Sequence, residues 1–128
     1  MIERIVPKNT PTPRGPYSPV VRAGDFIFVA GQGPVDPVSD EMSLGSIEHE
    51  TRITLDNVKR LVEAAGATLA DVVKVSVFLR DGNDFAAMNA VYKEFFGDAP
   101  PARTTVAVAF AHPAMKVEID CIAWKPAK

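Results

Sequence analysis

The sequence predicts a single α+β domain, and three observations lead to that fold class. The chain has 128 residues, of which 47% are hydrophobic and 23% charged, as is usual for one globular domain. Strand-like and helix-like patterns alternate along it in the order strands, helix, strand, helix, strands. It contains no internal repeat and no low-complexity tract. We therefore expect one domain over residues 1–128.

The first third of the chain predicts three strands. Residues 2–6 form a short apolar segment, and residues 7–19 carry five prolines, which exclude a helix or a central strand there. Residues 20–23 and 26–30 are rich in β-branched and aromatic side chains and are separated by Gly-Asp, a hairpin pattern. The glycines and proline of residues 31–34 predict the end of that strand.

The middle of the chain predicts an amphipathic surface helix. Ser46 is a good N-cap, and two glutamates follow in the first turn, where the helix dipole favours them. Apolar residues then recur at helical spacing from Ile47 to Ala65, with charged residues on the opposite face. Gly66 follows, and glycine is the residue type most often found just after the end of a helix.

The last part of the chain predicts a strand, a second helix and two more strands. Residues 71–79 are rich in β-branched side chains, and Asp84 is placed to cap a helix that ends at Gly97. Residues 104–110 and 117–124 have strand patterns. Taken alone, this order allows a simple hairpin of the last two strands.

The strands are apolar on both sides, yet only two helices are available to cover them. Phe26 and Phe28 alternate with Ile27 and Val29, so both sides of that strand carry large apolar groups. Crossover connections of one hand place both helices on the same face of a sheet. The uncovered face then needs another subunit, and the sequence predicts an oligomer.

Composition excludes several classes of function. The net charge of −2 and pI near 5.6 argue against a nucleic-acid binder, and no apolar run approaches the roughly 20 residues of a membrane helix. The N-terminus is too short and too charged for a signal peptide, so we expect a cytoplasmic protein. His49, His112 and the single Cys121 do not make a zinc site, and we expect no metal. Cys121 is interpreted as a small buried hydrophobic residue.

Arg103 and Glu118 are the most informative charged residues. Arg103 follows Pro100 and Pro101 at the beginning of a predicted strand, where a guanidinium can bind a carboxylate through two hydrogen bonds. Glu118 alternates with apolar residues in the last strand, where a carboxylate can orient or deprotonate water. Tyr17 is a rigid aromatic between prolines. The simpler interpretations are an exposed arginine, an edge charge and a ring that covers the core.

These two residues cannot share a small ligand in a simple hairpin. A turn near Pro113 would leave Arg103 about five residues, roughly 16 Å, from the partner of Glu118. Either the last two strands are not neighbours, or the site crosses a subunit interface.

The sequence resembles the Rid family, the YjgF-like reactive-intermediate deaminases, over nearly its whole length. The matching motifs are Gly15-Pro16-Tyr17-Ser18, Ala23 to Gln32, Thr51 to Gly66, Val77-Phe78-Leu79, Asn83-Asp84-Phe85, Asn89, Tyr92, Pro101-Ala102-Arg103-Thr104 and Val117-Glu118-Ile119. The resemblance implies a chorismate-mutase-like fold: a mixed six-stranded sheet with two helices on one face, assembled as a homotrimer with ligand sites between subunits. It also implies that the last strand inserts antiparallel into the sheet interior.

The resemblance further implies a hydrolase without a cofactor that converts 2-enamino and 2-imino acids to 2-keto acids and ammonia. Arg103 would clamp the substrate carboxylate and Glu118 would position water. The substrate-binding positions are Tyr17, Ala30, Gly31, Asn89, Arg103 and Thr105. Ala30, Thr105 and Pro19 depart from the serine, cysteine and glutamine that are common in the family, so the resemblance implies deaminase chemistry but does not fix the substrate.

Three alternatives to that activity follow from the same residues. The segment 103–108 also resembles the 2-aminomuconate deaminases of the same superfamily. A second alternative is a trimer that binds a small ligand or a protein without turnover. A ribonuclease or translation inhibitor is the third, and the acidic pI opposes it.

Overall fold

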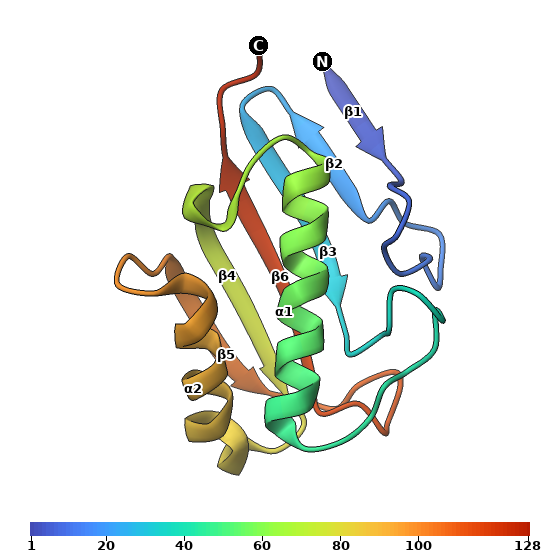
Figure 1. Cartoon of the computed structure of the whole chain (residues 1–128), viewed down its shortest axis with the longest axis vertical. Coiled ribbons are helices and arrows are strands. Elements are labelled where there is room, and N and C mark those ends of the chain that lie inside the picture. The colour runs from blue at the N-terminus through green and yellow to red at the C-terminus, as the bar shows by residue number, and fades with distance from the viewer.

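The computed structural model describes residues 1–128 as one six-stranded sheet with two long helices (Figure 1). In chain order the elements are β1 (Ile2–Ile5), β2 (Val20–Ala23), β3 (Phe26–Gln32), α1 (Ile47–Ala64), β4 (Val72–Leu79), α2 (Phe85–Phe96), β5 (Ala102–Ala107) and β6 (Val117–Trp124). Single 3-10 turns at Leu69–Asp71 and Gly82–Asp84 precede β4 and α2. Neither long helix is apolar enough over its length to cross a membrane. The predicted α+β class is confirmed.

The sheet order is β1-β2-β3-β6-β4-β5, so the last strand lies inside the sheet. It runs antiparallel to both neighbours, with Val29 opposite Cys121 and Val77 opposite Ile119. β4 and β5 are parallel and are connected through α2. The insertion implied by the family resemblance is confirmed, and the hairpin of the last two strands is wrong. A central position suits β6 because every second residue from Val117 to Ala123 is buried.

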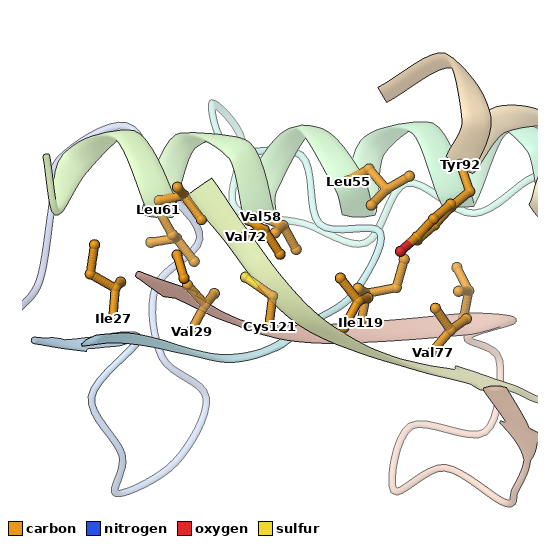
Figure 2. Close-up of a cluster of buried hydrophobic side chains, with 14 of the residues drawn as sticks. Ile27, Val29, Leu55, Val58, Leu61, Val72, Val77, Tyr92, Ile119 and Cys121 are labelled. Carbon is orange, nitrogen blue, oxygen red and sulfur yellow. The ribbon is translucent and has the colours of Figure 1, made fainter. Parts of the chain in front are cut away.

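Both helices cover the same face of the sheet and enclose the core (Figure 1). The core consists of 21 buried residues, drawn in part in Figure 2. Leu55, Val58 and Leu61 of α1 are fully buried against the strands. Burying one such side chain stabilises the fold by about 1.5–3 kcal/mol. Cys121 belongs to this core, as predicted, and burial raises the pKa of its thiol to about 12.

The opposite face of the sheet is not covered by helices and carries large apolar side chains. Phe26, Phe28 and Trp124 are 45%, 43% and 46% exposed. Phe26 is paired in register with Trp124, and the Phe26 and Phe28 ring centroids are 6.5 Å apart. The prediction that two helices leave one apolar face uncovered is confirmed.

Element boundaries differ from the sequence-based ones in three places. β3 continues through Gly31 to Gln32 with a register shift after Val29, so Gly31 lies within the strand and the strand ends just before Gly33. β5 begins at Ala102 and ends at Ala107, earlier than expected at both ends. Asp84 occupies the N-cap position of α2 without a side-chain hydrogen bond, while Asp81 accepts one from the Asn83 N–H in the preceding turn.

The structure confirms Ser46 as the N-cap of α1 and Gly66 as the glycine that follows its last turn. The Ser46 hydroxyl accepts a hydrogen bond from the His49 N–H at 3.1 Å. Gly66 follows the last turn with φ of +94°, a conformation that glycine adopts without strain.

Candidate functional site

Glu118 lies on the uncovered face of the sheet, against the backbone of β3. A Cβ atom at position 31 would be 2.6 Å from Glu118 Oε2, so only glycine allows the carboxylate to lie there. Burial, and then the charge of Asp120, raises the pKa of Glu118. A carboxylate with a raised pKa and no cation beside it is suited to accepting a proton.

The Glu118 carboxylate lines a hollow of about 240 Å³ together with Tyr17, Gly33, His112 and Met115. The Tyr17 hydroxyl accepts a hydrogen bond from the Arg14 N–H at 3.1 Å. The Arg14 side chain in turn forms an ion pair with Asp40 at 3.6 Å, which ties the proline-rich segment to the loop after β3. The structure therefore places Tyr17 and Glu118 in one hollow, and Gly31 directly beneath the carboxylate.

Ala30 lies at the bulge of β3, where its backbone is fully engaged. Its N–H donates to the Pro19 carbonyl at 2.9 Å, and its carbonyl accepts from Gln32 Nε2 at 3.1 Å. These bonds hold the proline-rich segment beside β3, but the Ala30 methyl group supplies no polar contact of its own.

Arg103 lies on the helix-covered side of β5, in a second hollow between β5 and α2. Its guanidinium carbon is 4.7 Å from the centroid of the Tyr92 ring and 5.5 Å from that of Phe85. It takes part in none of the five ion pairs of the chain. The two rings hold the guanidinium through cation–π contacts while leaving its N–H donors free for a ligand.

Three polar atoms on residues around Arg103 are buried without a hydrogen-bond partner. They are Asn89 Oδ1 and the Tyr92 hydroxyl, both on α2 residues that line the Arg103 hollow, and Thr105 Oγ1, two residues after Arg103. An unpartnered buried polar atom costs about 1–3 kcal/mol, and such atoms are characteristic of sites that receive a ligand or water.

Tyr92 lies on the buried side of α2, and sequence reasoning missed its contact with Arg103. Its side chain points from α2 into the core, where burial raises the pKa of its hydroxyl to about 12 (Figure 2). Only the ring face therefore serves Arg103. An aromatic residue three positions after Asn89 on a helix was the available signal, because such residues share a face.

Within one chain the two hollows lie on opposite faces of the sheet. Arg103 is in register with Val75, whose side chain is in the core, whereas Glu118 is in register with Phe78, which points to the uncovered face. β4 separates the two strands. The structure therefore brings Arg103 together with Asn89, and Glu118 together with Tyr17 and Gly31, but not the first set with the second. A ligand that touches both sets requires two copies of the chain.

No group of three histidine, cysteine, aspartate or glutamate side chains is close enough together to hold a metal ion. His49 lies on α1, where its Nε2 is 2.9 Å from the Ser43 hydroxyl, and His112 lies in the loop before β6.

Comparison with known proteins identifies the family. A family model described as Endoribonuclease L-PSP matches residues 7–125. A RutC family protein of Pyrococcus horikoshii is 49% identical over 125 residues, covering 98% of this chain and 99% of the relative. The 2-iminobutanoate/2-iminopropanoate deaminase of Escherichia coli is 42% identical over 126 residues, covering 96% and 98%. The crystal structure of Escherichia coli TdcF with bound serine superposes with a TM-score of 0.90 at 38% identity, covering 96% and 98%.

These matches extend over almost the whole chain, and the fold agrees with them. The chain belongs to the YjgF/RutC family, the family that its motifs resemble under the name Rid.

Proposed function

We propose that this protein is a hydrolase that deaminates 2-imino and 2-enamino acids to 2-keto acids and ammonia. The observation that carries the proposal is Arg103, a half-buried guanidinium in cation–π contact with the Tyr92 and Phe85 rings and in no ion pair with a carboxylate of the chain. A free guanidinium next to unpartnered Asn89 and Thr105 oxygens matches a small carboxylate with polar groups on its neighbouring carbon. The deaminase name of the Escherichia coli relative and the serine bound to TdcF support the same ligand class.

The proposed active form is a homotrimer with sites between subunits. The uncovered sheet face, with Phe26, Phe28 and Trp124, supplies an apolar surface for assembly. In such an assembly one subunit would contribute Arg103, Asn89 and Thr105. Its neighbour would contribute Glu118, Tyr17 and the Ala30–Gly31 backbone. This arrangement accounts for the placement of the two sets on opposite faces of a single sheet.

In the proposed reaction Arg103 binds the substrate carboxylate and presents the imine carbon to water. The substrate reacts as the protonated imine, and Glu118 accepts a proton from water as the water oxygen bonds to the imine carbon and C=N becomes a single bond, which leaves a neutral amino group. Glu118 then delivers that proton to the amino nitrogen. The C–N bond breaks and ammonia leaves while the hydroxyl proton returns to Glu118 and the carbonyl forms; the released ammonia takes up that proton. Orientation and charge neutralisation supply the rate, because the imine carbon is already electrophilic.

The first experiment is a coupled assay of imine decay. An amino-acid oxidase generates 2-iminobutanoate or 2-iminopropanoate, and loss of the imine is followed with wild type, Arg103→Ala and Glu118→Gln. Arg103→Ala should lose both binding and turnover, whereas Glu118→Gln should retain binding and lose kcat. Arg52→Ala is the matched control, since Arg52 is an exposed arginine paired with Glu94 on the outer helix surface. Equal activity of wild type and both site variants would refute the assignment.

Mixing the two inactive variants tests whether the site is shared between subunits. Random 1:1 reassembly of Arg103→Ala with Glu118→Gln leaves about one interface in four with both residues intact, so about a quarter of wild-type activity should return. No recovery from a verified mixed oligomer would refute a site that combines Arg103 of one subunit with Glu118 of its neighbour.

Assays of wild type and the same variants also distinguish the alternative activities. Decay of 2-aminomuconate without decay of the shorter imines would assign the pathway-specific deaminase. Tight binding of a 2-keto acid without any turnover would assign a binding protein. RNA cleavage that survives Arg103→Ala would be traced to a contaminant.

A further inference from the structure

The Arg103 hollow contains a second cation. Lys93 lies one helical turn after Asn89 on α2 and lines the same hollow of about 450 Å³. No acidic residue lines it. The adjacent acid, Glu94, points its carboxylate to Arg52, with which it forms two hydrogen bonds of 3.0 and 3.1 Å. Lys93 takes part in no ion pair of the chain.

Two uncompensated positive charges in one concave surface favour a ligand with two negative charges. A cleft lined by charges of one sign concentrates the opposite charge and raises the local concentration of a matching substrate. The two cations differ in character: Arg103 is a planar fork fixed on aromatic rings, and Lys93 is a mobile point charge. A lysine in the last turn also complements the dipole of α2. That effect does not require the lysine to line the Arg103 hollow, nor does it explain the absence of an acid there.

We propose that Lys93 binds a second carboxylate, so that the preferred substrates are dicarboxylic 2-imino acids. Arg103 would hold the carboxylate next to the imine carbon, and Lys93 the carboxylate at the far end of the substrate. This inference rests on the proposed deaminase function and selects a substrate class within it.

Two four-carbon imines form a matched pair for the test. 2-Iminosuccinate and 2-iminobutanoate differ only in a terminal carboxylate in place of a methyl group, and both are made in the assay by amino-acid oxidases. The measurement is the ratio of their kcat/KM values for wild type, Lys93→Met and Lys93→Glu. Lys8→Glu is the control, because Lys8 is exposed, lines neither hollow and changes the net charge equally.

The wild-type ratio should favour the dicarboxylate. Because Lys93 is exposed, Lys93→Met should lower the ratio by about two- to fivefold, the size of an exposed ion pair. Lys93→Glu should lower it further, since it adds repulsion, and the wild-type preference should weaken with added salt. Lys8→Glu should leave the ratio as in wild type.

A ratio that is unchanged in Lys93→Glu, with both imines still hydrolysed, would overturn this inference and leave the proposed function standing. If neither imine is hydrolysed, the proposed function fails, and calorimetry decides the ligand class separately. Oxaloacetate should then bind more tightly than 2-oxobutanoate to wild type but not to Lys93→Glu, and equal binding would overturn the inference. A change of oligomer mass in Lys93→Glu would assign the lysine to a subunit contact and overturn it as well.

Discussion

Gly31 allows the Glu118 carboxylate to lie against β3, and replacing this glycine tests the role of that carboxylate. A Cβ atom at position 31 would be 2.6 Å from Glu118 Oε2, 3.0 Å from Cδ and 3.3 Å from Cγ. Ordinary contacts of a Cβ atom begin near 3.4 Å. In Gly31→Ala the carboxylate oxygen must therefore move by about 0.8 Å, and the flexible glutamate side chain can make that movement.

A shift of this size should reduce turnover far more than stability. Misplacing a reacting group by about 1 Å can cost about 100-fold in rate, so we expect kcat to fall by about 10- to 100-fold. KM should change little, because the Arg103 that binds the carboxylate in the proposed site comes from the neighbouring subunit and is not altered by the substitution. The clash is with the end of a flexible side chain, and residue 31 does not have a positive φ. The free energy of unfolding should therefore change by less than about 1 kcal/mol.

The assay is imine decay under saturating substrate, with thermal unfolding measured on the same samples. Gly82→Ala is the matched control, since a Cβ atom there meets nothing within 4 Å. If Gly31→Ala turns over within twofold of wild type, Glu118 does not position water from the place where it lies. A large loss of stability would instead show that the carboxylate cannot move aside.

Three further predictions concern other parts of the site and the fold. Phe85→Leu should raise KM about two- to fivefold, because a cation–π contact to Arg103 contributes about 0.5–1 kcal/mol, and Phe85→Trp should restore it. An unchanged KM in Phe85→Leu, or a KM that Phe85→Trp does not restore, would contradict this. Glu50→Ala should lower the free energy of unfolding by about 3–5 kcal/mol, measured by denaturant titration. The fully buried Glu50 carboxylate accepts hydrogen bonds from the Gly45 N–H, the Lys116 backbone N–H and Lys116 Nζ. The fall of kcat/KM toward acid pH should have its midpoint above pH 4.5, the ordinary pKa of a glutamate, because burial and then Asp120 raise the pKa of Glu118 and only its ionised form accepts a proton. Asp120→Asn should move that midpoint to lower pH. If the same acid fall remains in Glu118→Gln, it belongs to another group.

Much of the candidate site was accessible from the sequence through short motifs. Arg103, Glu118, Tyr17 and Asn89 were identified by residue type and by the matching segments around them. The roles of Phe85 and Tyr92 beside Arg103 were not, since both read as apolar positions of a helix. Their contact depends on how α2 packs on β5, which no local pattern encodes.

Local patterns in the sequence were enough to predict the helices, the strands and a second apolar face of the sheet. Hydrophobic periods of two and of 3.6 residues mark strands and helices locally, and the alternation of Phe26 with Ile27 shows that both sides of β3 are apolar. A helix cap such as Ser46 is equally local, since its bond reaches only three residues along the chain.

The position of β6 between β3 and β4 and the opposite orientation of Arg103 and Glu118 depend on tertiary strand pairing. The sequence pointed to the first only through the family resemblance, and the second emerged from the structure. Strand pairing joins residues up to about a hundred positions apart, such as Phe26 and Trp124, and one residue of register reverses the face of every side chain. Local patterns carry no information on that pairing. The division of the site between two hollows follows from it.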